Sequence, residues 1–297
     1  MLWVKFYLKE YVFKFLILAI FSIFALITVF CFVPEIQNRN GASAEVAEEV
    51  IKLPILMYHG LTENSNHENK FVINVGLFES DLEYLTQNGF NTIFIRDLID
   101  FVYNDGILPE KPIMITFDDG YRNNYFYAFP LIKKYECKMI FSPIGKCIDD
   151  YTKIQDKNIK YSHSTWPEIK EMVDSGLVEV QNHSYDMHSC KKRKGCKKVK
   201  SESKSSYEKF FKSDVLKFQE ECLKNLGTAP TAFVYPFGAM CNESEELLHD
   251  LGFKVTVSCE GKINFIRKKP NSLYKLRRFI RPNKISTKKF FKKITTN

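Results

Sequence analysis

Short apolar runs alternate with amphipathic segments from residue 53 onward. The apolar runs have the length and composition of buried strands, and they cover residues 53–60, 91–95, 112–117, 138–144, 178–183, 231–238 and 254–259. The segments between them carry apolar residues at helical spacing and cover residues 75–90, 96–106, 125–135, 165–177 and 242–253. This alternation predicts an α/β fold with a largely parallel sheet or barrel.

Local signals mark where several of these helices begin and end. Gly89 follows the apolar positions of 75–90 and predicts the C-terminal end of that helix. Thr165 and Asn242 are expected N-caps, and Pro167 suits the first turn of the helix after Thr165.

The N-terminal pattern is different. Residues 15–33, FLILAIFSIFALITVFCFV, form 19 residues without a charge, which is enough for a helix to cross a bilayer. Three lysines precede this run, so the N-terminus is expected in the cytoplasm and the rest outside. A cleaved signal peptide is the alternative, because 42–44 (ASA) has the form of a cleavage site. We expect a single-pass protein of the cell membrane with an extracytoplasmic domain.

These patterns predict four parts. Residues 1–34 would be the cytoplasmic N-terminus and transmembrane anchor, and 35–52 a polar stalk. Residues 53–282 would form the folded domain, and 283–297 a basic C-terminal tail.

The formal net charge of +8 is unevenly spread over a chain of globular composition. From residue 262 to the end there are 13 Lys and Arg and no acidic residue, and residues 190–204 hold eight Lys and Arg with one Glu. Two readings stay open: a solvated surface with a disordered tail, or attraction to anionic lipid headgroups or an anionic wall polymer. Nucleic acid is not expected as a partner of an exported protein.

The eight cysteines indicate no cysteine-based metal site, since paired CxxC motifs are absent from the sequence. Cys190 and Cys196 are the only close pair in the exported part. They could form a disulfide or remain free thiols.

Chemically active residues sit at the ends of the predicted strands. His59 ends the first run, Asp118 and Asp119 end 112–117, and His183 ends 178–183 with His188 five residues on. In parallel α/β folds these ends meet at one rim. One aspartate and two histidines there could bind a divalent metal and leave positions open for water and substrate. Each residue alone also has an ordinary structural explanation.

The adjacent carboxylates of Asp118 and Asp119 raise a geometric question. Neighbouring residues of a strand point to opposite faces, so the two can share a task only if the chain bends. Gly120 permits such a bend.

The motifs ITFDDGY, HSYDMH and YPFG together resemble those of the polysaccharide deacetylases, carbohydrate esterase family four, which have the NodB-homology fold. The resemblance covers about residues 53–282. The opening run PILMYHG resembles the branch that deacetylates poly-β-1,6-N-acetylglucosamine and carries its motifs in circularly permuted order.

The resemblance implies a distorted (β/α)7 barrel and a divalent metal, zinc first, with cobalt, nickel or iron as alternatives. It also implies roles: Asp119, His183 and His188 as metal ligands, Asp118 as general base, His59 as general acid, and the Phe237 N–H as oxyanion donor. The expected function is therefore a membrane-anchored, metal-dependent deacetylase of N-acetylglucosamine in a cell-surface exopolysaccharide.

Two departures bear on the substrate. Val234 stands where the peptidoglycan branch usually has an arginine, and no histidine follows His249 to serve as a late acid. Both departures favour the permuted branch. The alternatives are a peptidoglycan N-acetylglucosamine deacetylase, an O-acetyl esterase and a catalytically silent glycan-binding protein.

Overall fold

Strand β6 (Pro112–Asp119) runs through the middle of a parallel sheet in a computed structural model that describes residues 49–296. All eight of its residues are buried, as expected for a strand covered on both faces. The strand order is β12 (Phe279–Ile280), β2 (Ile55–Tyr58), β6, β7 (Met139–Pro143) and β8 (Val178–Val180), with β5 (Asn91–Thr92) beside the start of β6. The α/β prediction is confirmed.

Single bridges extend this sheet. Strands β9 (Ala232–Val234) and β10 (Val255–Val257) form a parallel pair. Bridges join Asn182, just after β8, to Phe233, and Val257 to Leu276, just before β12. Two further pairs lie outside this path: β1 (Ile51–Leu53) with β11 (Asn264–Ile266), and β3 (Gly60–Thr62) with β4 (Val72–Asn74). A closed (β/α)7 barrel stays a prediction.

The expected helices are present: α2 (Val75–Gln87), α3 (Ile95–Tyr103), α4 (Phe129–Lys134), α6 (Trp166–Asp174) and α8 (Asn242–Asp250). Thr165 caps α6 as predicted, and Gly89 follows α2 with a φ of 69°. Two details were wrong. Cys241, not Asn242, is the N-cap of α8. The expected strand 91–95 is only two residues long, because Ile95 already belongs to α3.

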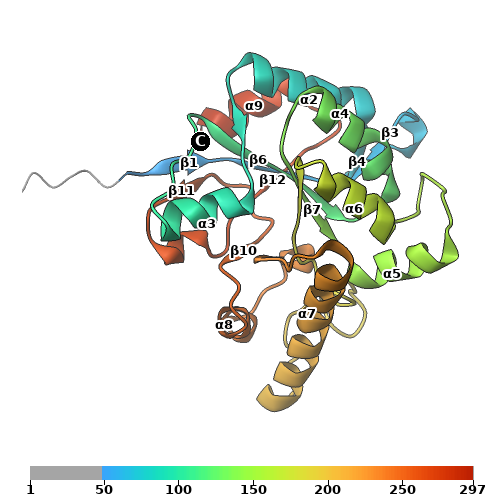
Figure 1. The fold of residues 1–297 in the computed structure, drawn as a ribbon, viewed down its shortest axis with the longest axis vertical. Helices are drawn as coiled ribbons and strands as arrows, with labels where there is room; N and C mark the ends of the chain where they lie inside the picture. The colour runs from blue at the N-terminus through green and yellow to red at the C-terminus, as the bar shows by residue number, and fades with distance from the viewer. Residues whose placement is uncertain (1–48, 297) are drawn as a thin grey trace, which may run out of the picture. The chain divides into compact units, whose positions relative to one another are not determined.

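Three helices were not predicted: α5 (Gly145–Ile154), α7 (Lys204–Leu226) and α9 (Thr287–Thr296). Helix α7 follows the basic insert and buries one apolar stripe at helical spacing, made of Tyr207, Phe211, Val215, Phe218 and Cys222. Figure 1 shows α7 and α8 at the bottom of the view and α2 and α9 at the top, while Phe218 and Cys222 of α7 belong to the same buried cluster as the apolar residues of α2.

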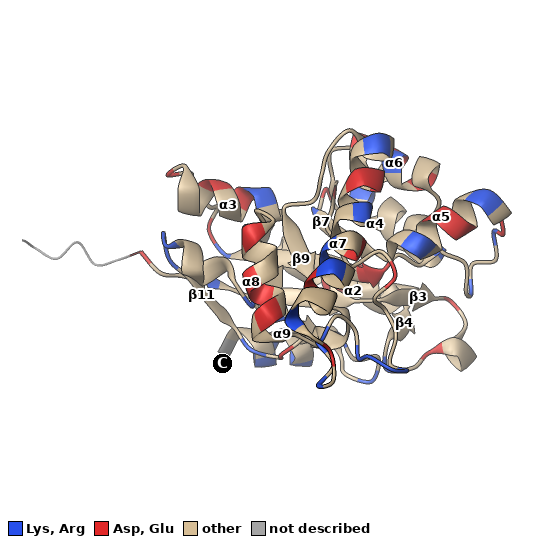
Figure 2. Ribbon diagram, turned by 90° about the horizontal axis from the view of Figure 1, so that it is seen from below, with Lys and Arg blue, Asp and Glu red and all other residues tan. Residues whose placement is uncertain are grey.

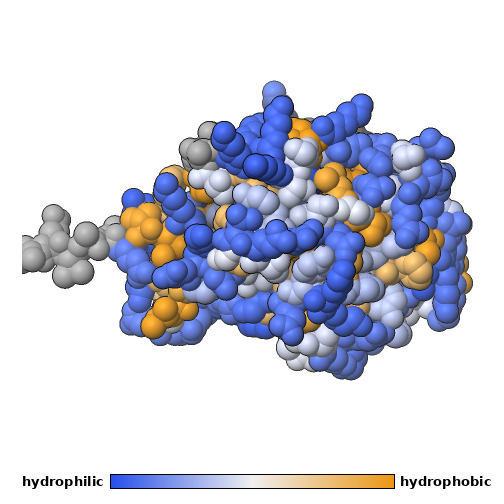
Figure 3. Space-filling view, turned by 90° about the horizontal axis from the view of Figure 1, so that it is seen from above, coloured by the Kyte–Doolittle hydropathy of each residue, from blue (hydrophilic) through white to orange (hydrophobic). Residues whose placement is uncertain are grey.

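The expected basic tail is a packed helix. Phe290, Phe291 and Ile294 of α9 are buried, and the Phe291 ring stacks on Tyr84 of α2 at 4.6 Å between centroids. The boundary predicted after residue 282 therefore falls inside the compact unit, which begins at residue 49. The lysines of α9 lie on its exposed side, and Figure 3 shows that face as largely hydrophilic with small separate hydrophobic patches.

A buried ion pair joins α2 to the segment between β12 and α9. Arg281, just after β12, donates two hydrogen bonds to Asp81 of α2, at 2.7 and 3.0 Å. The Thr287 hydroxyl at the start of α9 and the Tyr58 hydroxyl also donate to the Asp81 carboxylate, at 2.7 and 2.9 Å. Breaking a buried pair by removing one partner typically costs ~3–5 kcal/mol, so this network is a main tie of the C-terminal segment.

Two other expectations concern cysteines and the membrane. Cys190 and Cys196 are free thiols, the first exposed and the second buried, so the disulfide alternative is wrong for this structure. Between residues 49 and 296, no helix combines the length and the apolar character needed to cross a membrane. The predicted anchor at 15–33 and most of the stalk lie outside the described residues.

Candidate metal centre

The chain bends at Asp119 itself. This residue has a φ of 67° and Gly120 has a φ of 84°, so two consecutive residues are left-handed at the end of β6. Aspartate tolerates this conformation better than most residues, whereas a Cβ on Gly120 would lie 2.5 Å from the Cβ of Pro143. The bend lets both Asp118 and Asp119 line one pocket of about 620 Å³.

Asp119, His183 and His188 form a three-ligand cluster. Their potential ligand atoms all lie within 4.8 Å of one another. Asp119 Oδ1 is 3.2 Å from His188 Nε2 and 3.6 Å from His183 Nε2, and it is a buried oxygen without a hydrogen-bond partner. One carboxylate and two imidazoles around an unsatisfied oxygen fit a divalent metal such as zinc.

The second ring nitrogen of His183 defines its tautomer. Nδ1 lies 2.7 Å from the Val234 carbonyl oxygen, which can only accept, so Nδ1 carries the proton and Nε2 faces Asp119. Burial lowers the pKa of His183, but Asp118 and Asp119 outweigh it and raise the pKa overall. Burial, together with His183, lowers the pKa of His188 to about 4, which leaves its ring neutral, as a ligand must be.

Helix α7 holds the loop between the two histidines. The Asp214 carboxylate accepts hydrogen bonds from the backbone amides of Tyr185 and Asp186, both at 2.7 Å. Within the loop, the Ser184 hydroxyl accepts from the Met187 amide, and Ser184 itself has a φ of 70°. Burial raises the pKa of Asp214 to about 6. The long helix that sequence reasoning missed therefore helps to place His188.

Arg278 is the main residue that sequence reasoning missed. Its guanidinium makes two hydrogen bonds to Asp118, both 2.7 Å, and a third to the Thr116 hydroxyl at 3.0 Å. Arg278 and Asp118 are both almost fully buried. Burial would raise the pKa of Asp118, but Arg278 and His183 hold it well below its usual value. The only signal in the sequence was a pair of arginines before two apolar residues, RRFI.

His59 lines the same pocket from the end of β2. Its Nδ1 is buried without a hydrogen-bond partner, and its ring lies 4.9 Å from that of Phe71. Burial lowers the pKa of His59 more than the nearby Asp118 and Asp119 raise it, so the ring is neutral near pH 7.

Phe237 also reaches this pocket. It sits in a short 3₁₀ turn, Pro236–Gly238, with a φ of 56°, and its ring lies 4.2 Å from that of His188. Asp119, Ser184 and Phe237 are thus three left-handed residues at one site. Positive φ values at residues other than glycine are strained, and such residues cluster at functional sites.

The basic insert 190–204 borders the pocket through Lys194. The Cys196 thiol donates to the Ala239 carbonyl at 3.2 Å, which attaches the insert to the chain just after the YPFG turn. Part of the insert's charge is balanced, because Arg193 pairs with Glu202 at 2.7 Å and Lys198 with Glu243 at 3.5 Å. Glu243 belongs to α8, along which acidic residues gather (Figure 2).

Comparisons with known proteins point to one family. Residues 105–256, just over half of the chain, match the model of the family described as polysaccharide deacetylase. Poly-beta-1,6-N-acetyl-D-glucosamine N-deacetylase of Escherichia coli K12 is 22% identical over 287 residues, which cover 89% of this chain and 42% of that protein. The Staphylococcus aureus MRSA252 protein of the same name is 24% identical over 203 residues, covering 67% of this chain and 65% of that protein.

A solved structure of a de-N-acetylase from Aggregatibacter actinomycetemcomitans superposes with a TM-score of 0.70 at 22% identity, covering 82% of this chain and 99% of that one. The fold is therefore the NodB-like α/β fold of deacetylases. The chain spans about two fifths of the length of the E. coli relative that it matches. With a family match over half its length, this chain belongs to the polysaccharide deacetylase family.

Proposed function

We propose that this protein is a metal-dependent N-deacetylase that hydrolyses the N-acetyl groups of N-acetylglucosamine in a β-1,6-linked exopolysaccharide. The observation that carries the proposal is a buried, ionised Asp118 in the same pocket as the Asp119, His183 and His188 cluster. The names of the E. coli and S. aureus relatives support the substrate.

Asp119, His183 and His188 would hold the metal. A divalent metal supplies Lewis acidity at such a site, since zinc enzymes lower the pKa of a bound water to ~7 and polarise carbonyl groups. The Val234 carbonyl keeps the His183 ring in the orientation and tautomer that this requires.

Asp118 would accept a proton from the attacking water. Its two oxygens are each fixed by one N–H of Arg278, and each retains a free lone pair for the water. Because the guanidinium lowers the pKa of Asp118, the carboxylate is ionised near neutral pH and ready to accept. Arg278 is thus a positioning residue for the base.

His59 would deliver a proton to the departing sugar amine. Because the ring is mainly neutral near pH 7, His59 would first take up a proton, and its unpartnered Nδ1 leaves a ring nitrogen available for this. The lowered pKa then makes the protonated ring a stronger acid. The Phe237 N–H would stabilise the negative charge on the acetyl oxygen, a contribution typically worth ~3–4 kcal/mol to the transition state.

Changing Asp118 to Asn is expected to abolish turnover while the metal stays bound. An amide cannot accept the proton, and loss of general-base catalysis typically costs ~10²–10⁴ in rate. Acetate release and metal content measured on the same sample check this. Wild-type rates in Asp118→Asn would show that another group is the base.

The substrate proposal is tested by acetate release from β-1,6-linked and β-1,4-linked N-acetylglucosamine oligomers of equal length. We expect a clear preference for the β-1,6 linkage. A preference for β-1,4 would indicate peptidoglycan as the substrate, and release only from O-acetylated sugars would indicate an esterase. A metal-loaded protein that binds oligomers without releasing acetate from any of them would be a silent glycan-binding protein.

Two further properties remain proposals. The apolar run 15–33 would anchor the protein in the cell membrane, with the catalytic domain outside. The exposed lysines of α9 and of the insert 190–204 would favour approach to anionic lipid headgroups or an anionic wall polymer.

A further inference from the structure

A second pocket of about 540 Å³ adjoins the first. The two pockets share Asn69 and Val72 in their walls, so they adjoin at these two residues. Each falls within the ~300–1,000 Å³ that is typical of ligand sites. The second is named here the amide pocket, because four asparagines line it: Asn64, Asn66, Asn69 and Asn123.

The first wall of the amide pocket is formed by residues 61–72 and the second by the loop that contains residues 159–160, and Asn123 joins the two. The Asn123 side-chain oxygen accepts from the Leu61 amide at 3.0 Å, and its nitrogen donates to the Ile159 carbonyl at 3.3 Å. Asn123 is 3% exposed and lies four residues after Asp119. The amide pocket is therefore built on the same segment that carries the base and the metal ligand.

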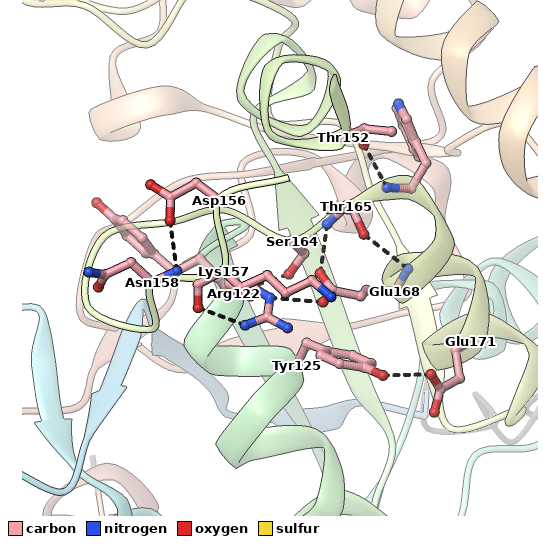
Figure 4. A network of polar contacts seen from close by, with 12 residues as sticks. Arg122, Tyr125, Thr152, Asp156, Lys157, Asn158, Ser164, Thr165, Glu168 and Glu171 are labelled. Carbon is pink, nitrogen blue, oxygen red and sulfur yellow. Dashed lines mark hydrogen bonds and ion pairs between the residues drawn. The ribbon is translucent and has the colours of Figure 1, made fainter. Parts of the chain in front are cut away.

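Both walls are fixed in place. In the first, the Asn69 side-chain oxygen accepts from the amides of Phe71 and Val72 at 2.8 and 3.1 Å. In the second, Arg122 donates to Glu168 of α6 at 2.8 Å and to the Lys157 carbonyl at 2.9 Å, as Figure 4 shows. A pocket with such preorganised walls loses little entropy when a ligand binds.

The groups that face the amide pocket suit a sugar. The Asn66 amide and the His67 ring make no side-chain hydrogen bond within residues 49–296, so both are available to a ligand. Tyr127 adds an aromatic ring, and the charges of Glu63 and Lys160 are opposite. Amides both donate and accept, as sugar hydroxyls and N-acetyl groups do, and the balanced charge favours an uncharged ligand.

We propose that the amide pocket binds further N-acetylated sugar units of the same polymer, beyond the unit that is deacetylated. This proposal rests on the proposed function. It adds the direction in which the polymer lies on the protein and a preference for a minimum length of oligomer. The polymer runs from the Asp119 cluster past Asn69 and Val72 toward Asn66 and His67. The protein then favours long oligomers over short ones.

The test compares the double variant Asn66→Ala/His67→Ala with Ser65→Ala, a control in the same exposed turn that does not line the pocket. The readout is kcat/KM for a β-1,6 hexasaccharide divided by kcat/KM for the disaccharide. Loss of two ligand hydrogen bonds is expected to lower this ratio by roughly tenfold. In Ser65→Ala the ratio is expected to equal that of the wild type.

Affinity for the hexasaccharide is measured in parallel in the metal-loaded Asp118→Asn background, where the bound oligomer is not consumed. There the double variant should bind the hexasaccharide more weakly by a similar factor. An unchanged ratio with unchanged affinity would overturn the amide pocket as a sugar site. If the wild type releases no acetate but the affinity still falls in the double variant, the proposed function fails and the sugar site stands.

Discussion

Replacement of Asp119 by Asn is expected to remove bound metal and acetate release together. Asparagine tolerates the left-handed backbone at this position, so the fold is preserved while the anionic ligand is lost. Loss of a ligand should weaken metal binding by more than the ~10–100-fold caused by losing a ligand's hydrogen-bond partner. Metal content after dialysis and acetate release are the two measurements.

The matched control is Asp186→Asn. Asp186 lies between the two histidines in sequence, but its carboxylate is exposed and pairs with Lys146. It should keep both metal and activity. If Asp119→Asn retained stoichiometric metal, the three-ligand assignment would be wrong, whatever happened to the rate.

Replacement of Arg278 by Met is expected to lower both stability and activity. The change leaves Asp118 as a buried carboxylate without its partner, and such losses typically cost ~3–5 kcal/mol in the free energy of unfolding. The base also loses the two hydrogen bonds that orient it. Urea denaturation and acetate release check the two effects separately.

A second change separates stability from catalysis. Adding Asp118→Asn to Arg278→Met removes the unpaired charge, so the double variant should regain stability without regaining activity. Arg277→Met is the control, since Arg277 is only half-buried. Unchanged unfolding in Arg278→Met would contradict the role of the buried pair.

The strand ends were the most predictable part of the site. Apolar runs end at His59, Asp118 and His183, and parallel strands bring such ends to one rim. The position of the bend was harder to predict. The sequence indicated a bend at Gly120, whereas the backbone already has a positive φ at Asp119. A positive φ at a residue with a side chain is imposed by surrounding packing, which no local pattern encodes.

Arg278 was not predictable for a different reason. It lies 160 residues after Asp118, and the C-terminal region holds many cations, so composition alone could not select the partner. The same excess of lysine is the reason that α9 was not predicted. Its buried residues Phe290, Phe291 and Ile294 do have helical spacing, but lysines surround them. The apolar stripe of α7 also has helical spacing, but it directly follows the basic insert, and the alternation of apolar runs does not predict a helix there.

The two buried arginines near the C-terminus have a consequence for the order in which the molecule is made. Synthesis proceeds from the N-terminus, so His59, Asp118, His183 and His188 all emerge before Arg278 and Arg281. Until those arginines arrive, Asp118 and Asp81 lack the cations that make their burial favourable. We therefore expect the site to be completed late in biogenesis: a nascent chain stalled before residue 278 would carry the three proposed metal ligands, whereas Asp118, the proposed base, would lack the arginine that orients it.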